Sequence, residues 1–413
     1  MTNRWLTLLY IQCVWFVISF VTNIIGPLMP VIISDFHLSL TLAGVLPFAF
    51  FLSYGLVSIP AGMLIETRGA HFALLLAFSV NLAGSLLFAL HPTYLTAVAA
   101  LFIIGMGMAI LQVVINPLTR SAGGEAHFAF FAVMGQLVFG LASYLSPMVF
   151  SAIMTHKGVL SLWLSSLMNL TRAPHWVLLY WLFAVLFVLI ALVTLPLDLT
   201  GVELKSDEKS EPLRVYFDLL RDRYVILFFL GIAAYVGTEQ SIANWMSPFL
   251  ETYHGIDPNT TGAQTVGDFW GLMSVGCLVG LLLLKLTDSR MVLRGAVVAA
   301  MVCFLAALFG PATVSLLAFP LCGFCLSVMF SIIFSLGLNS IPKHHGALSG
   351  ILCSGILGGA IAPLIVGTLG ELVSLRTSLL LVFVMLFYML SISFWARPLV
   401  RNATLFDKER APS

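Results

Sequence analysis

One acidic side chain lies deep inside an apolar segment of this sequence and is the residue best suited to chemistry there. It is Glu239, within the run Tyr235-Val236-Gly237-Thr238-Glu239-Gln240-Ser241. An ionisable group is costly in hydrocarbon unless it faces protein or water, so it marks a functional site by default. Because burial disfavours the charged form of a carboxyl group, Glu239 is suited to bind and release a proton as its access to solvent changes. The alternative is a structural acid that anchors helix packing through hydrogen bonds to Tyr235 or to a neighbouring helix.

Side-chain amides accompany this acid on several apolar segments. Gln112 and Asn116 are four residues apart and share one helix face, and Gln240 and Asn244 repeat that spacing. The remaining members of the set are Asn23, Gln136 and Asn339. Amides supply hydrogen-bond donors and acceptors with no net charge to desolvate, which suits a neutral polyhydroxylated ligand. For any one of them, a hydrogen bond that joins two helices is an equally good explanation.

Two tryptophans are candidates for stacking against a sugar ring. Trp270 lies in Gly267-Asp268-Phe269-Trp270-Gly271, where glycine leaves room for a ligand, and Trp245 follows Asn244. A belt of tryptophan at the membrane interface is the alternative, and it fits Trp270 less well than it fits Trp5 or Trp176. We expect Asp268 to be an interfacial acid at a helix N-terminus.

Other kinds of chemistry lack their motifs in this sequence. It contains no Walker motif, metal-ligand cluster, nucleophile elbow or phosphate-cradling loop, so we expect neither an enzyme nor a bound cofactor or metal. Cys322 and Cys325 form a CxxC, but a membrane helix offers it no second pair of ligands, and small apolar filler is the favoured interpretation. The formal net charge of +1 implies no nucleic-acid partner.

The elements that must position these residues are membrane-spanning helices. Of the 413 residues, 60% are hydrophobic and only 9% are charged, and a soluble protein of this length would need more charge to cover its surface. A spanning helix needs about 20 apolar residues. Twelve such spans are expected, near residues 7–33, 42–65, 70–90, 94–116, 127–153, 176–197, 224–250, 264–287, 290–310, 312–338, 346–369 and 375–397. The chain is therefore predicted to be an all-α membrane protein.

The most charged stretch of the chain separates the first six spans from the last six. The expected division is an N-terminal six-helix bundle over 1–197, a cytoplasmic linker over 198–223, a C-terminal six-helix bundle over 224–400 and a cytoplasmic tail over 401–413. With the N-terminus in the cytoplasm, sixteen of the nineteen Lys and Arg residues lie inside, and Lys157, Arg172 and Arg376 lie outside. We therefore expect a multi-pass protein of the cell inner (plasma) membrane with both termini in the cytoplasm.

The two halves of the sequence show weak internal similarity. Ser53-Tyr54-Gly55 corresponds to Ser274-Val275-Gly276, and Pro147 corresponds to Pro363, at offsets of roughly half the chain. Two similar, pseudo-symmetric six-helix bundles that face each other across a cavity resemble the major facilitator superfamily. Residues 62–69 also resemble a degraded copy of the cytoplasmic GxLaDrxGr signature of that superfamily.

Three further motifs resemble the glucose/galactose branch of the fucose:proton symporter family. Ile110-Leu111-Gln112-Val113-Val114-Ile115-Asn116-Pro117 resembles its ILQxxxNP, Tyr235-Val236-Gly237-Thr238-Glu239 its YVGxE, and residues 349–364 its SGxLCxxxxGGAIxPL. The resemblance covers most of the chain. It implies a secondary active transporter, expected to be a monomer, that moves a hexose or related small neutral solute by alternating access with proton coupling.

One departure from the family pattern concerns the coupling acid. The family usually has an Asn-Asp pair in its first helix, with the acid serving proton coupling, whereas alignment on Pro30 puts Gly26 there and leaves Asn23 nearby. Glu239 is then the expected carrier of the coupling proton. The open alternatives are an efflux carrier for drug-like or amphipathic compounds, an uncoupled or Na⁺-coupled sugar carrier, and a non-transporting sensor or membrane-embedded enzyme.

Overall fold

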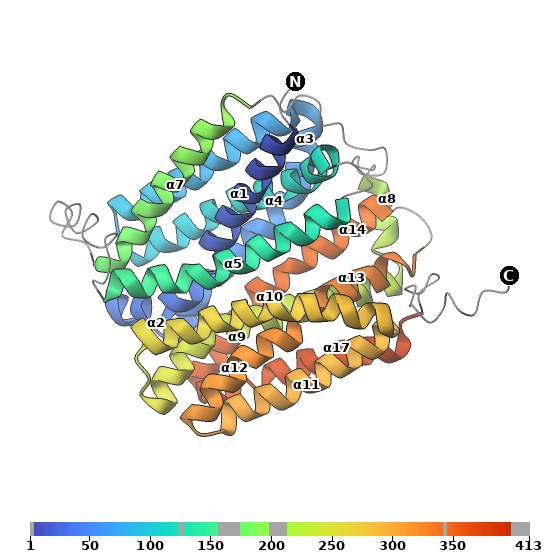
Figure 1. Cartoon of the computed structure of the whole chain (residues 1–413). Helices are drawn as coiled ribbons and strands as arrows, with labels where there is room; N and C mark the ends of the chain where they lie inside the picture. The colour runs from blue at the N-terminus through green and yellow to red at the C-terminus, as the bar shows by residue number, and fades with distance from the viewer. Residues whose placement is uncertain (1–3, 124–127, 156–173, 198–212, 342–344, 398–413) are drawn as a thin grey trace.

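Helices make up every regular element in the part of the chain that the computed structural model describes (Figure 1). The described residues are 4–123, 128–155, 174–197, 213–341 and 345–397. Within them, 12 helical stretches are long and apolar enough to cross a membrane. These stretches overlap the spans that the sequence predicts, so the all-α fold with twelve transmembrane helices is confirmed.

The first six spans contain one break that the sequence explains. Their elements are α1 (Arg4–Thr22), α2 (Ile25–Phe36), α3 (Leu40–Leu90), α4 (Tyr94–Gly123), α5 (Phe128–Met154), the short turn η2 (His175–Val177) and α7 (Leu178–Thr194). The first span is interrupted at Asn23 and Ile24, between α1 and α2. Pro27 has no N–H to donate to the carbonyl of Asn23, which weakens the helix at that point.

Helix α3 contains the second and third spans, which meet at Gly69. The backbone there has φ 82° and ψ 165°, a conformation that a residue with a side chain rarely adopts. Gly69 is the last residue of the motif at 62–69. The turn between these two spans therefore depends on a glycine that the sequence motif already contains.

The last six spans contain further breaks. Their elements are α9 (Arg223–His254), η3 (Pro258–Gly262), α10 (Ala263–Leu286), α11 (Ser289–Phe309), α12 (Ala312–Leu326), α13 (Met329–Leu338), α14 (His345–Ser354), η4 (Gly355–Leu357), α15 (Gly358–Leu372), α16 (Leu375–Ser378) and α17 (Leu381–Trp395). The eleventh span changes from an α-helix to a 3-10 turn at η4. Gly355, Gly358 and Gly359 lie in or beside this turn, and glycine is a poor helix former.

The two sets of spans form two groups of helices. Figure 1 shows α1, α4, α5 and α7 together in the upper part of the view and α9, α11, α12 and α17 together in the lower part. We call the end of the bundle at which α1 begins and α17 ends the terminal face, which lies toward the N and C labels. The other end, where α2 ends at Phe36 and α9 ends at His254, is the far face.

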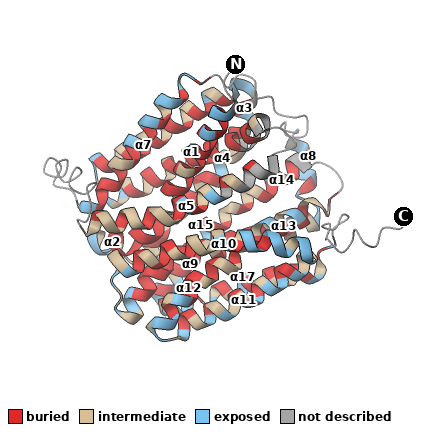
Figure 2. Cartoon of the chain, viewed as in Figure 1, coloured by how far each residue is buried: buried red, intermediate tan, exposed pale blue. Residues whose placement is uncertain are grey.

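Apolar side chains cover much of the outside of the bundle. On α7, Val185, Leu189 and Leu192 are each more than half exposed. Figure 2 shows such exposed residues along the outer helices, with buried residues between the helices. Large apolar side chains in this number are stable only where lipid is the solvent, so the surface is that of a multi-pass membrane protein.

The linker between the two sets of spans contains a short helix. Residues 198–212 lie outside the described residues, but α8 (Leu213–Leu219) follows them directly before α9. Arg214 and Asp218 face each other across one turn of α8, with 3.9 Å between Nε and Oδ2, and both are exposed. The sequence predicts charge and solvent exposure here but not the helix. The tail at 401–413 lies outside the described residues.

Candidate functional site

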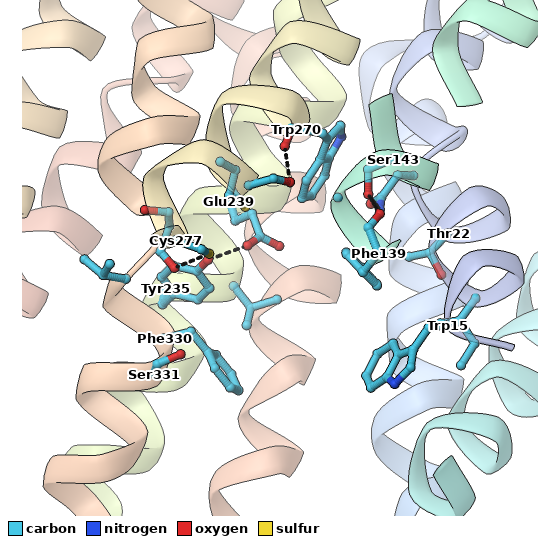
Figure 3. Close-up of a pocket in the computed structure, with 18 of the residues that line it drawn as sticks. Trp15, Thr22, Phe139, Ser143, Tyr235, Glu239, Trp270, Cys277, Phe330 and Ser331 are labelled. Atoms are coloured by element: carbon cyan, nitrogen blue, oxygen red, sulfur yellow. Dashed lines mark hydrogen bonds between the residues drawn. The ribbon is translucent and has the colours of Figure 1, made fainter. Parts of the chain in front are cut away.

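A cavity of about 420 Å³ lies between the two groups of helices. Side chains of α1, α3, α4 and α5 line one side, and side chains of α9, α10 and α13 line the other (Figure 3). The lining runs from Asn23 and Trp270 to Leu284, near the end of α10. The cavity therefore extends toward the terminal face, and at the far face the two groups touch, for example where Thr41 of α3 hydrogen-bonds Glu371 of α15.

Glu239 is the one charged side chain among the described residues that line the cavity. It is half-buried on α9, where the hydroxyl of Tyr235 donates to Oε2 at 2.6 Å and Nε2 of Gln240 donates to Oε1 at 3.1 Å. Asn244 continues the chain of hydrogen bonds, because its Nδ2 donates to Oε1 of Gln240 at 3.4 Å. The carboxylate thus accepts two hydrogen bonds and faces no cation in the described lining.

A second polar cluster lies on the wall formed by α1 and α5. Nδ2 of Asn23, which lies just after α1, donates to Oγ of Ser143 on α5 at 2.8 Å, and the hydroxyls of Ser19 and Ser143 are 2.6 Å apart. Ser143 also donates to the backbone carbonyl of Phe139 at 2.9 Å. Figure 3 shows Ser143 and Thr22 on this wall and Tyr235 and Glu239 on the opposite one. A ligand in the cavity would therefore meet polar groups from both halves.

Three of these polar residues share a position relative to a proline. Asn23, Ser143 and Asn244 each lie four residues before a proline, namely Pro27, Pro147 and Pro248. A proline cannot donate to the carbonyl four residues earlier, so each helix has a free acceptor beside a polar side chain. Such sites are tolerated inside a membrane only where protein or water satisfies them.

Trp270 of α10 lines the cavity with a side chain whose N–H group is buried. Its side chain is only 4% exposed, and Nε1 has no hydrogen-bond partner among the described residues. Thr22 Oγ1 on the other wall is likewise buried and without a partner in the described part of the chain. Buried donors and acceptors are nearly always hydrogen-bonded, so an orphan beside a cavity points to a ligand or water as its partner.

Large apolar side chains dominate the part of the cavity nearest the terminal face, although the hydroxyl side chains Thr119, Ser327 and Ser331 also line it. Leu278, Leu281 and Leu284 of α10 line it, together with Val328 and Phe330 from the break between α12 and α13 and from α13 itself. Most of the polar groups therefore lie toward the closed end of the cavity, and the approach to them is mainly apolar.

The structure brings five of the predicted site residues to this one cavity: Asn23, Gln112, Glu239, Gln240 and Trp270. Asn244 lies behind Gln240, is 2% exposed and does not line the cavity. The side chains of Asn116 and Gln136 lie outside the described residues.

Three other polar or aromatic candidates lie away from the cavity. Asn339 follows α13 at the terminal face, where its Nδ2 donates to Oγ of Ser335 at 3.3 Å. Nε1 of Trp245 donates to the carbonyl of Pro363 at 3.0 Å, so this fully buried ring joins α9 to α15. Asp268 accepts from Nε2 of Gln264 at 2.8 Å near the start of α10, where an interfacial acid is expected.

Several cavity residues are neither acids nor amides, so they are not among the residues that the sequence predicts for the site. Trp15, Ile18 and Thr22 precede Asn23 at helical spacing on one face of α1, so the amide itself marks that face. Ser143 carries a different signal, its place four residues before Pro147. Phe330 has no signal of this kind, because an aromatic residue in an apolar helix is common.

Comparison with known proteins gives matches over most of the chain. Residues 13–354 match the model of the Major Facilitator Superfamily. A glucose/galactose transporter of Brucella abortus biovar 1 (strain 9-941) is 28% identical over 384 residues, which are 92% of this chain and 91% of that protein. The L-fucose-proton symporter of Escherichia coli (strain K12) is 24% identical over 381 residues, 86% of this chain and 85% of that protein.

Solved structures share the fold. The crystal structure of the transporter FucP in the outward conformation has a TM-score of 0.67 at 21% identity and covers 94% of this chain and 98% of that one. A bacterial homolog of the human lysosomal transporter Spinster, in an inward-facing and occupied conformation, has a TM-score of 0.77 at 16% identity, with 96% and 97% covered. With the family model matched over residues 13–354 of 413, the chain belongs to the major facilitator superfamily.

Proposed function

We propose that the protein carries a hexose or a related small neutral solute across the cell inner (plasma) membrane by alternating access, coupled to a proton that Glu239 binds. The relatives named glucose/galactose transporter and L-fucose-proton symporter support this substrate class and this coupling ion. The observation that carries the proposal is the place of Glu239, the one charged side chain in the described lining of a cavity between two groups of helices.

Coupling follows from the electrostatics of an uncompensated carboxylate. No Lys, Arg or His in the described lining offsets the charge of Glu239, and an ion enclosed in a low-dielectric protein without a partner is unfavourable. The hydrogen bonds from Tyr235 and Gln240 hold the ionised form while water fills the open cavity. Proton binding neutralises Glu239, so closure of the cavity around the substrate becomes favourable only after a proton has bound.

The substrate would bind between the two polar clusters. Asn23, Gln112 and Gln240 would exchange hydrogen bonds with its hydroxyl groups, and the orphan Nε1 of Trp270 would donate to one of them. Asn244 would orient Gln240 from behind. Amides can serve either as donor or as acceptor, so such a site binds a polyhydroxylated molecule without requiring it to be charged.

The two halves would act as the moving bodies. In this proposal residues 1–197 and 224–400 rock against each other, joined by the linker at 198–223. The excess of Lys and Arg at the terminal face supports its placement in the cytoplasm, with both termini. In that orientation the cavity opens inward in this structure.

Replacement of Trp270 by Phe is expected to raise the KM of uptake roughly fivefold, because it keeps the aromatic face and removes one hydrogen bond, worth about 1 kcal/mol. The matched change Trp245→Phe removes a bond between α9 and α15 instead, and should lower thermal stability with little change in KM. Initial rates in proteoliposomes and thermal unfolding of both variants check this. An unchanged KM in Trp270→Phe would show that the N–H of Trp270 does not bind the substrate.

A carrier for amphipathic compounds is the second candidate function. The apolar approach formed by Leu278, Leu281 and Leu284 favours it, because a drug-like molecule would gain from contact with that wall. The polar groups at the closed end of the cavity and the names of the similar transporters favour a sugar as the substrate.

A panel of competitors in proteoliposomes separates these two functions. Under the sugar proposal, hexoses that differ at one hydroxyl compete very unequally, since a buried polar group left without its partner is costly. Apolar compounds of similar size compete weakly. Broad competition among unrelated apolar compounds, with no discrimination between hexose epimers, would favour the amphipathic carrier. If hexose only equilibrates across the membrane, the protein is an uncoupled carrier. If uptake needs Na⁺, it is a Na⁺-coupled carrier. Either result would contradict proton symport.

A further inference from the structure

The two halves touch at the far face mainly through three pairs of helices. Helix α2 contacts α9, α3 contacts α15, and α5 contacts α10. The cavity extends from these contacts toward the terminal face. Contacts among these helices beyond the cavity therefore close its far end in this structure, and they must separate if the far end is to open.

Gly26 of α2 lies directly against the backbone of α9. A Cβ atom at this position would lie 2.5 Å from the carbonyl oxygen of Ala243 and 3.3 Å from its carbonyl carbon. Real Cβ atoms do not come this close to another atom, and a backbone carbonyl of a packed helix cannot rotate away as a side chain can. The absence of a side chain at Gly26 is thus what permits α2 and α9 to meet.

Gly367 of α15 repeats this arrangement from the other half. A Cβ atom there would press against the carbonyl oxygen of Leu40, the first residue of α3, and would lie 2.8 Å from Cζ2 of Trp245. Trp245 is fully buried and its Nε1 is bonded to Pro363, so its ring is not free to move aside. Small residues commonly allow such close approach between membrane helices.

Glu371, one turn beyond Gly367, caps a helix of the opposite half. Its Oε2 accepts from the backbone N–H of Thr41 at 3.2 Å and from Oγ1 of Thr41 at 2.5 Å. Thr41 lies in the first turn of α3, where N–H groups lack partners within the helix and the helix dipole favours a negative charge. Ser39, the N-cap of α3, accepts from the N–H of Leu42 within the same half, whereas the N–H of Thr41 is satisfied by Glu371 only while the two halves are together.

We propose that these contacts form a closing device for the far face. Gly26 and Gly367 let the halves meet, and Glu371 stabilises the closed arrangement by capping α3 across the interface. Any side chain larger than hydrogen at either glycine holds the far end of the cavity open. Loss of the charge at Glu371 weakens closure by a smaller amount. The device is independent of which solute the protein carries.

The distance between the halves at the far face tests this device without any substrate. Spin labels would be attached at Leu95→Cys, at the start of α4, and at Val373→Cys, just after α15, in a background without the six native cysteines. Both positions are well exposed, at 76% and 65%. Pulsed electron–electron resonance in nanodiscs then reports the populations of the short (closed) and long (open) distances.

Gly26→Ala and Gly367→Ala are each expected to lower the ratio of closed to open molecules roughly tenfold or more, since overpacking of this kind is costly. Glu371→Gln is expected to lower it roughly two- to fivefold, the size of a charge–dipole interaction at a helix end. Two matched controls should leave the ratio unchanged. Gly295→Ala adds a Cβ where no atom lies within 4 Å, and Glu251→Gln removes an exposed carboxylate at the far end of α9.

An unchanged ratio in Gly26→Ala and Gly367→Ala would overturn the role of the glycines, and an unchanged ratio in Glu371→Gln would overturn the cap. Glu371→Gln alters no packing, so it tests whether Glu371 stabilises the closed arrangement even if a glycine variant fails to purify as a single species. Failure of either glycine variant to fold, with Gly295→Ala folding normally, would instead assign that contact to stability rather than to closure. None of these results depends on sugar transport.

Discussion

Replacement of Glu239 by Gln is expected to abolish accumulation of the substrate against a gradient while its equilibration across the membrane continues. Glutamine has nearly the shape of a protonated glutamate and keeps hydrogen-bonding capacity toward Tyr235 and Gln240. It cannot carry a proton, so the proton gradient no longer drives transport. Because the side chain is permanently neutral, the cavity can close around the substrate at any pH.

Energised membrane vesicles and counterflow assays separate these two activities. The inside-to-outside ratio of labelled hexose should fall to equality in Glu239→Gln, and collapse of the proton gradient should no longer change it. Counterflow, which needs only exchange, should persist. In the unchanged protein we expect counterflow to decline toward alkaline pH as Glu239 loses its proton, and in Glu239→Gln this decline should be absent. Asp268→Asn is the matched control, because Asp268 is bonded to Gln264 outside the cavity and its loss should leave accumulation intact. Accumulation that survives in Glu239→Gln would place the coupling site elsewhere.

Replacement of Asn23 by Leu should raise the KM for the substrate about 10- to 100-fold, corresponding to one or two lost hydrogen bonds worth roughly 1–3 kcal/mol in a buried site. Leucine has a similar volume, so the packing around α1 and α5 is largely kept. Ser19 and Ser143 remain bonded to each other and to the carbonyl of Phe139, so no hydroxyl of this cluster is left without a partner.

Asn339→Leu provides the control for that change. Asn339 is also an amide at the end of a membrane helix, but its partner is Ser335 at the terminal face and it does not line the cavity. Its replacement should change KM by less than about twofold, as is usual for sites away from the bound ligand. Uptake rates and size-exclusion profiles of both variants should be measured together. Equal effects of the two changes would show that the Asn23 cluster does not bind the substrate.

The positions of the twelve spans follow from the sequence, because lipid requires about 20 apolar residues in each of them. Apolar length does not predict the breaks inside the spans. The interruption at Asn23 reflects Pro27, but Pro30 stands within α2 without ending it. A proline weakens a helix, and the packing of the neighbouring helices decides whether the helix opens.

The acid of the candidate site could be predicted and its surroundings only in part. Glu239 stands out because a charge is rare in a membrane helix. The places of the amides are harder to predict, since this kind of side chain lines the cavity at Gln112, bonds another amide behind the cavity wall at Asn244 and bonds a hydroxyl outside the cavity at Asn339. Which of these occurs depends on the direction that each helix face takes in the bundle.

By itself, the sequence determined the twelve helices and the one acid deep within them, because these depend on local hydrophobicity and on the rarity of charge in lipid. Its motifs indicated the family. Only the tertiary structure decided that Asn23 meets Ser143, that Trp270 lines the cavity while its N–H has no partner among the described residues, and that Gly26 lies against Ala243 in the other half. Contacts of this kind join helices far apart in the chain. They are set by how two bundles pack, and no local pattern of residues records that packing.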